Sequence, residues 1–231
     1  MKVAIMQPYF LPYIGYFQLI QAVDKFIILD DVNYIPKGWI NRNRILVNHQ
    51  PYLFTLPLQK ASQNKKINEL YLEQDLKQHS KLLKTIYLAY KKAPYFEFYS
   101  ILEEIVHYPK IQLINYIEHS LQKIMIYLNI QTQMIKSASV YQNQHLKGQA
   151  RILDICQQEQ ADTYINLMGG QALYDKNAFA QAGIQLQFIQ TQPIVYKQFS
   201  NHFVPNLSII DVLMFNSTKQ SQFLLNQYQL V

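Results

Sequence analysis

Residues 3–30 read VAIMQPYFLPYIGYFQLIQAVDKFIILD, and this stretch decides the fold. The apolar runs at residues 3–6 and 25–30 each predict a buried strand. Between them, two closely spaced prolines exclude a helix in the first loop, whereas residues 16–23 show the apolar face of a helix. Strand, loop, helix and strand within about thirty residues predict a βαβ unit, in which the two strands are parallel.

The remaining pattern extends this unit into a larger α/β chain. Residues 40–47 and 52–58 alternate as a hairpin does, with a turn expected at residues 48–51. Helical periodicity from about residue 80 to 130 predicts three helices. The elements expected beyond residue 130 are a helix at 144–159, a strand at 161–166, a helix at 173–182 with Gly183 as its C-cap, a strand at 184–189 and a helix capped by Ser208.

We therefore expect a single α/β domain over residues 1–231. Its predicted fold is Rossmann-like, of the HUP type, with a mainly parallel sheet and helices on both faces. A helical insert is expected at about residues 68–130. Hydrophobic residues make up 49% of the chain and charged residues 16%, which indicates a globular protein and excludes a disordered one.

Charge and cysteine content narrow the function classes. The net charge of +6 suits an anionic ligand such as a nucleotide or an RNA acceptor stem, although on charge alone a mildly basic soluble protein is the better explanation. The single cysteine, Cys156, excludes an internal disulfide and a CxxC metal site. The start of the chain lacks the apolar region of a signal peptide, and no stretch is long enough to span a membrane. We expect a cytoplasmic protein.

Three unusual loops map to the carboxyl edge of the predicted sheet, where open parallel sheets bind ligands. The loop at residues 7–15 leads into a helix N-terminus, which attracts anions. Its form is similar to the HIGH-type loop of nucleotidylyltransferases without the histidines, and an aromatic plug is the structural alternative. The loop at residues 30–44 carries acids, arginines and asparagines. A solvated hairpin edge is the structural alternative, but Trp39 and Tyr34 beside the charges favour a binding site. The loop at residues 164–174 contains two consecutive glycines, which also fit a plain turn.

These loops supply the candidate site residues. The predicted substrate-binding residues are Gln7, Tyr9, Tyr13, Asn33, Lys37, Trp39, Asn41, Arg42, Arg44, Tyr164, Asn166, Gly169, Gly170 and Tyr174. The catalytic candidates are Asp30, Asp31 and His202, because carboxylates at a strand end and a histidine in a late loop can act on protons. The six histidines show no metal-ligand spacing, so we expect no metal site and no firmly bound cofactor.

Four stretches of this sequence resemble the WbqC-like family. They are MQPYFLPYIGYF at residues 6–17, Asp31-Val32 with the WINRN run at 39–43, the segment from Tyr164 to Tyr174 with its glycine pair, and LSIIDVLMFN at residues 207–216. The resemblance spans almost the whole chain. It implies an accessory enzyme of O-antigen, capsule or related clusters, which acylates or aminoacylates an amino sugar. Its partners would be a nucleotide sugar and a donor such as an aminoacyl-tRNA or an acyl thioester.

The sequence is compatible with three functions. The leading hypothesis is an acyl- or aminoacyltransferase, with glycyl transfer as one version, acting on the amine of a nucleotide-linked amino sugar. The second is an ATP-dependent nucleotidyltransferase or ligase. The third is a non-catalytic binding module in a polysaccharide pathway.

Overall fold

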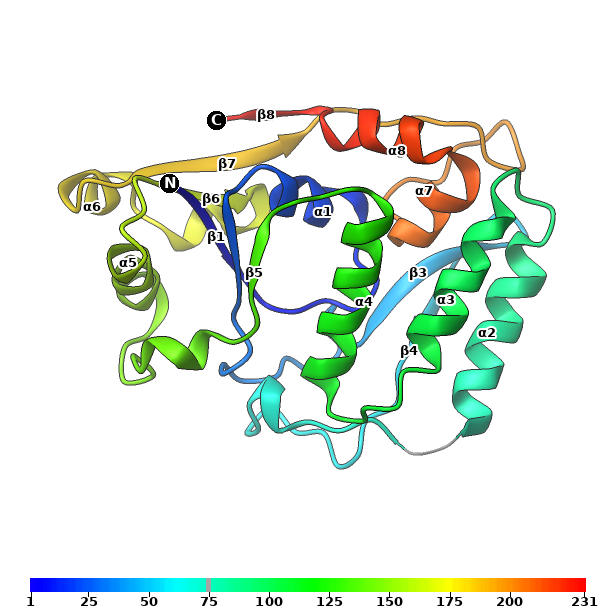
Figure 1. Cartoon of the computed structure of the whole chain (residues 1–231), viewed down its shortest axis with the longest axis horizontal. Helices are drawn as coiled ribbons and strands as arrows, with labels where there is room; N and C mark the ends of the chain where they lie inside the picture. The colour runs from blue at the N-terminus through cyan, green and yellow to red at the C-terminus, as the bar shows by residue number, and fades with distance from the viewer. Residues whose placement is uncertain (74–75) are drawn as a thin grey trace.

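A computed structural model describes residues 1–73 and 76–231 of the chain. Its main sheet has six strands in the order β5-β2-β1-β6-β7-β8, of which only β8 is antiparallel to its neighbour (Figure 1). The strands of this sheet are β1 (Lys2–Met6), β2 (Lys25–Ile28), β5 (Gln133–Ile135), β6 (Thr163–Leu167), β7 (Gln185–Thr191) and β8 (Tyr228–Leu230). The expected α/β fold with a mainly parallel sheet is confirmed.

Helices cover both faces of the sheet, and the pleat of β1 shows why. Ala4 packs into a core with α1 and α4, whereas Val3 and Ile5 pack on the other face against α5 and α6. Alternate residues of one strand thus serve two apolar cores. The α-helices are α1 (Ile14–Gln21), α2 (Leu76–Tyr90), α3 (Tyr99–Val106), α4 (Leu113–Tyr127), α5 (Gly148–Gln158), α6 (Lys176–Gln181), α7 (Ile209–Phe215) and α8 (Thr218–Leu225).

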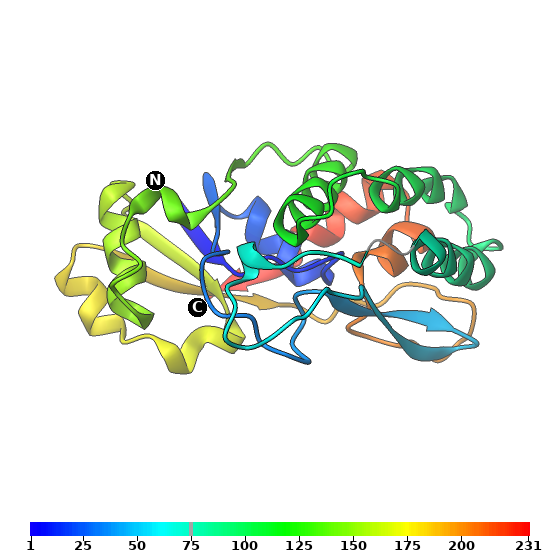
Figure 2. The same ribbon diagram turned by 90° about the horizontal axis from the view of Figure 1, so that it is seen from below.

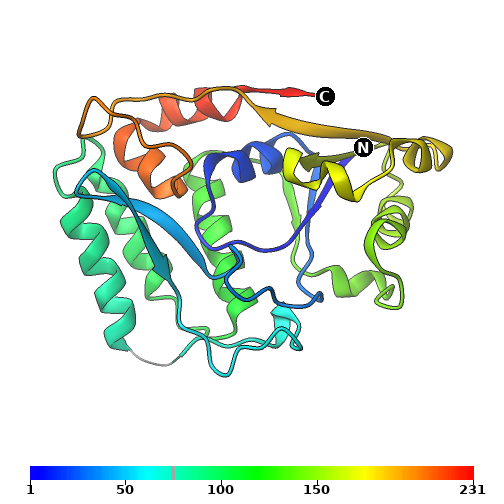
Figure 3. The same cartoon turned by 180° about the vertical axis from the view of Figure 1, so that it is seen from behind.

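A hairpin of β3 (Arg42–Val47) and β4 (Gln50–Thr55) stands apart from the main sheet. In Figures 2 and 3 it lies at the same end of the molecule as α2 and α3, opposite to α5 and α6. Helices α2, α3 and α4 occupy the stretch predicted as a helical insert. Residues 74 and 75 of that stretch lie outside the described residues, and the division of the chain into one domain with an insert stays a prediction.

Several element boundaries differ from those expected. The hairpin turn consists of Asn48 and His49 alone, because Pro51 already pairs with Leu46 inside β4. Helix α5 begins at residue 148 rather than 144, and α6 begins at 176 after a short 3-10 helix, η4 (Met168–Leu173). The remaining 3-10 helices are η1 (Ile67–Glu69), η2 (Phe96–Phe98) and η3 (Ala138–Tyr141).

Two predicted caps are confirmed, and two strands were not foreseen. Ser208 caps α7 by accepting a hydrogen bond from the N–H of Ile210, and Gly183 follows α6 with φ of 74°. Strands β5 and β8 were not expected from the sequence. Each has only three residues, and both form edges of the sheet. Within the described residues, no helix combines the length and the apolar composition that a membrane crossing requires.

Candidate functional site

The candidate site lies at the carboxyl edge of the sheet. Strands β2, β1 and β6 are adjacent and parallel, so the loops that follow them leave the sheet at the same edge. The connection from β1 leads to β2 on one side, and the connection from β6 leads to β7 on the other. This reversal is the topological switch point at which α/β sheets bind ligands.

Leu11 ties the first loop to two distant segments. It adopts a left-handed conformation with φ of 45°, which costs a non-glycine residue about 1–2 kcal/mol. Its carbonyl accepts hydrogen bonds from Asn43 Nδ2 at 2.8 Å and from Ser208 Oγ at 2.7 Å. The N–H of Phe10 donates to the carbonyl of Ile40 at 2.9 Å. The first loop, the start of β3 and the N-terminus of α7 are therefore held together.

This junction forms a pocket of about 390 Å³, which we call the aromatic pocket. It is lined by Tyr9, Tyr13, Trp39, Asn43, Arg44 and Asn206. The Cζ atom of Arg44 lies 5.2 Å from the centre of the Trp39 ring, within the range of a cation–π contact. A planar aromatic surface beside a guanidinium can hold a sugar or base ring together with an anionic group.

The two tyrosines of the aromatic pocket are neutral hydrogen-bonding groups. Burial raises the pKa of Tyr9, and burial together with the nearby Tyr9 raises the pKa of Tyr13 to about 12. Both phenols therefore keep their protons near neutral pH and can donate hydrogen bonds. Gly15 makes room for the Tyr13 ring, because a Cβ atom at residue 15 would overlap it.

Three other predicted residues of the second loop lie beside the aromatic pocket. Asn41 is buried, and both ends of its amide are occupied, since Oδ1 accepts from the Tyr34 hydroxyl at 2.9 Å and Nδ2 donates to a backbone carbonyl at 2.7 Å. Arg42 donates from Nε to the carbonyl of Gly38 at 2.7 Å. Lys37 is exposed. In the part of the chain that the structure describes, none of these three lines the pocket.

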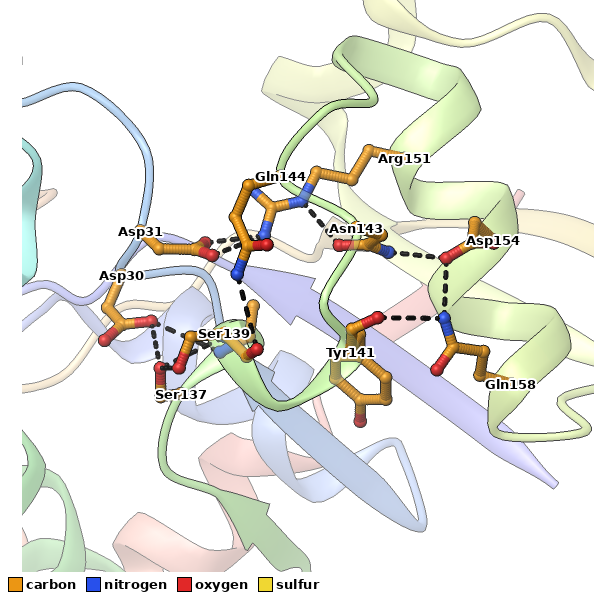
Figure 4. Close-up of polar contacts among 11 residues, drawn as sticks. Asp30, Asp31, Ser137, Ser139, Tyr141, Asn143, Gln144, Arg151, Asp154 and Gln158 are labelled. Carbon is orange, nitrogen blue, oxygen red and sulfur yellow. Dashed lines mark hydrogen bonds and ion pairs between the residues drawn. The ribbon is translucent and has the colours of Figure 1, made fainter.

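The adjacent acids Asp30 and Asp31 contact different partners (Figure 4). Asp30 accepts hydrogen bonds from Ser137 Oγ at 2.7 Å and from the N–H of Ala138 at 3.2 Å, and burial raises its pKa. Asp31 accepts from Nη2 of Arg151 at 2.7 Å through each of its oxygens. Asp30 therefore fixes the segment after β5, whereas Asp31 forms a buried ion pair with α5.

Arg151 is held from a second side as well. Its Nε donates to Oδ1 of Asn143 at 2.9 Å, and Asn143 donates in turn to Asp154 at 2.6 Å. Gln158 also donates to Asp154, at 2.8 Å. Figure 4 shows this row of polar side chains running along α5 toward Asp31. The guanidinium is thus fixed in one orientation by a chain of neighbours.

A second pocket, of about 490 Å³, opens beside this ion pair, and we call it the arginine pocket. It is lined by Leu29, Asp31, Val32, Asn33, Lys66, Gln144, Leu146, Lys147, Gly148, Arg151, Ile152 and Tyr174. Residues of the second and third loops therefore meet here. Asp31 and Asn33 of the second loop and Tyr174 of the third loop line the same pocket.

Tyr164 and Asn166 of the third loop are packed inward. Tyr164 is fully buried, and its hydroxyl accepts a hydrogen bond from Nδ2 of Asn166 at 3.0 Å. A Cβ atom at Gly170 would lie 2.9 Å from the same amide nitrogen, whereas one at Gly169 would meet open space. Tyr174 is the one predicted residue of this loop that lines the arginine pocket in the described part of the chain. The roles predicted for these residues stay predictions.

Gln7 and His202 do not line either pocket in the described structure. The backbone carbonyl of Gln7 accepts a hydrogen bond from the Tyr16 hydroxyl at 2.8 Å. His202 is exposed in the loop that precedes α7. A general base must reach the proton that it removes, and the catalytic role of His202 stays a prediction.

The sequence model of the WbqC-like protein family matches residues 7–223. This chain belongs to that family. It is 32% identical over 219 residues to the "Uncharacterized protein Rv1507c" of Mycobacterium tuberculosis (strain ATCC 25618 / H37Rv), and the match covers 92% of each chain. No solved structure matches this chain.

In this WbqC-like chain, sequence reasoning missed Lys66, Lys147 and Arg151 in the arginine pocket, Asn143 beside Arg151, and Asn206 in the aromatic pocket. Arg151 and Asn143 fix the arginine pocket, and Asn206 completes the wall of the aromatic pocket. A buried arginine on an otherwise apolar helix face was a usable signal for Arg151, because an arginine is rarely buried without a partner. Asn206 lies in a loop with φ of 57° and offered no comparable pattern.

Proposed function

We propose that this WbqC-like protein transfers an acyl or aminoacyl group to the amine of a nucleotide-linked amino sugar for O-antigen or capsule biosynthesis. Glycyl is one candidate for the group transferred. The aromatic pocket carries the proposal, because Arg44 stands over the Trp39 ring and two tyrosines line the same pocket. The rings suit a sugar or a base, and the guanidinium suits a phosphate. Such nucleotide sugars are cytoplasmic metabolites, so the reaction is placed in the cytoplasm.

The proposed reaction replaces a C–O or C–S bond of the donor by a C–N bond and moves one proton. The sugar amine attacks the carbonyl carbon of the donor, and a new C–N bond forms. The C–O bond of an aminoacyl ester or of an acyl adenylate, or the C–S bond of an acyl thioester, breaks. The proton lost from the nitrogen goes to the leaving alcohol or thiol or, when AMP leaves, to solvent, so that an amide results. An aromatic-walled pocket limits the access of water to the reactive carbonyl.

In the proposal, the chain's side chains bind and orient the reactants. Arg44 holds the phosphate of the nucleotide sugar, and Lys37 and Arg42 add positive charge beside it. Asp31 orients Arg151 at the edge of the neighbouring pocket. Asp30 is occupied by Ser137 and Ala138 and supports this segment.

The test is a transfer assay read by mass. Purified protein is incubated with an amino-sugar nucleotide and with an aminoacyl-tRNA, an acyl thioester or ATP plus free acid. The expected product is the sugar nucleotide with the mass of the added group. Loss of a charge-assisted bond in Arg44→Gln is expected to lower kcat/KM by about ten- to a hundredfold. The exposed Lys219 on α8 provides the control, and Lys219→Gln should leave the rate unchanged.

Other outcomes select the other functions. Pyrophosphate release that needs ATP and Mg²⁺, without acylated sugar, would replace the proposal by nucleotidyl transfer or ligation. Tight binding of the nucleotide sugar without turnover for any donor would leave a binding module.

A further inference from the structure

We infer that the arginine pocket is a second anion subsite, which takes a phosphate or diphosphate group. This inference rests on the proposed function only for the identity of the ligand, namely the phosphate-bearing donor that reacts with the nucleotide sugar. The charges and hydrogen bonds of the pocket, and the chain segment that it shares with the aromatic pocket, support an anion site independently of that ligand.

The lining of the pocket is positive. Lys66, Lys147 and Arg151 bring three positive charges against the single negative charge of Asp31, a formal balance of 3 − 1 = +2. In the described residues neither lysine has an ion-pair partner. Positive side chains that converge on a hollow from different segments attract an anion, since Asp31 offsets only one of the three charges.

Arg151 still has donors to offer. A guanidinium carries five N–H groups, and the bonds to Asn143 and Asp31 are made by Nε and Nη2. The other terminal nitrogen, Nη1, donates to no residue that the structure describes, although the side chain is only 6% exposed. Nη1 is not fully buried and keeps some contact with solvent, and Arg151 is one of the residues that line the pocket.

The neighbours of Arg151 fix it for binding. Asp31 and Asn143 hold the guanidinium in one orientation, so that little side-chain entropy is lost when Nη1 binds an oxygen. Lys66 is positioned by the backbone, because the N–H of Ile67 donates to the carbonyl of Val32 at 3.0 Å. Asn33 and Tyr174 add neutral hydrogen-bonding groups to the wall. An anchored arginine with two lysines is an arrangement that suits phosphate oxygens.

The position of the pocket explains why a transferase would need it. Both pockets are built on the segment from Asp31 to Arg44, with the aromatic pocket near its end and the arginine pocket at its start. Each donor considered for the reaction, whether aminoacyl-tRNA, thioester of a phosphorylated carrier or acyl adenylate, bears phosphate. Two phosphate-bearing substrates need two anion subsites.

Isothermal titration with inorganic pyrophosphate and with adenosine diphosphate tests the inference. Wild-type protein should bind each with saturation. The double variant Lys66→Gln/Lys147→Gln should bind at least about tenfold more weakly, because two charge-assisted contacts are lost. Both lysines are at least partly exposed and unpaired in the described structure, so the variant is expected to fold. Thermal melting checks this directly.

Two controls separate the pockets. Lys219→Gln should change the affinity by less than about twofold, and Arg44→Gln, whose residue lines the other pocket, should retain the binding that depends on Lys66 and Lys147. The inference is overturned if wild-type protein binds neither ligand, if the double variant binds as well as wild type, or if Arg44→Gln alone abolishes binding. Pyrophosphate binding without sugar acylation would support the anion subsite and contradict the proposed transfer. Sugar acylation without pyrophosphate binding would support the transfer and contradict the subsite.

Discussion

Gly15 is the residue at which the first loop has least room. A Cβ atom there would overlap the ring of Tyr13 and lie 3.1 Å from Oγ1 of Thr191. We expect Gly15→Ala to lower the free energy of unfolding by about 1–3 kcal/mol, as overpacking does. Gly169→Ala is the matched control, because nothing lies within 4 Å of its Cβ position. Urea denaturation measures both, and equal losses in the two variants would contradict the packing at Gly15.

Asp211 is a buried acid with three donors. It accepts hydrogen bonds from the hydroxyls of Tyr90 at 2.9 Å and Tyr196 at 2.6 Å, and from Nε2 of Gln198 at 2.7 Å. Burial raises its pKa despite these bonds. The folded protein therefore holds this proton more tightly than the unfolded chain does, and the corresponding stability is present at low pH and lost as pH rises.

The comparison with Asp211→Asn isolates this effect. The unfolding free energy of wild type relative to the variant should fall as pH rises from about 4, the ordinary pKa of an aspartate, through the raised folded value. Denaturation series at several pH values measure the difference. A difference that is constant with pH, or one that grows, would show that the carboxyl is not desolvated.

At the scale of elements, the ion pair between Asp31 and Arg151 joins the segment after β2 to α5. The side chains are 2% and 6% exposed, so removal of one partner leaves a buried charge alone. Asp31→Asn should lower the free energy of unfolding by about 3–5 kcal/mol. Adding Arg151→Met should restore part of that loss. Additive losses in the double variant would mean that the pair is not coupled.

The β3–β4 hairpin contains a strained turn that a single substitution can relieve. Asn48 and His49 have φ of 49° and 62°, as both central residues of a type I′ turn do. Because Asn-Gly is the favoured pair in this turn, His49→Gly should raise the free energy of unfolding by about 0.5–1 kcal/mol, after the added entropy of the unfolded chain is subtracted. A lower melting temperature would contradict the turn geometry.

At the scale of the whole molecule, long apolar runs and helix-capping residues made the fold predictable. The buried runs that became β1 and β2, and the serine that caps α7, were sufficient to place an α/β sheet with helices on both faces. Strands β5 and β8 could not be foreseen, because three residues at a sheet edge carry no distinctive pattern. Helix α5 was predicted to begin four residues too early, since the residues before Gly148 carry no strong signal for a helix start.

The sequence predicted which chain segments form the candidate site, but not which side chains contact one another there. Loops at the carboxyl ends of parallel strands must lie near one another, so the first and second loops could be placed together from topology. The partner of Asp31 could not, because Arg151 is 120 residues away along the chain. The inward packing of Asn41 and Asn166 also depends on neighbours that only the folded chain supplies.

The central claim is that the first loop and the second loop form a pocket for a nucleotide-linked sugar. Trp39 is the only tryptophan of the chain and lines the aromatic pocket, so its fluorescence reports directly on a ligand there. Titration with an amino-sugar nucleotide should change the emission with saturation, and Arg44→Gln should weaken the binding by at least about tenfold. Unchanged Trp39 emission at saturating ligand, or equal affinity in the variant, would contradict the account.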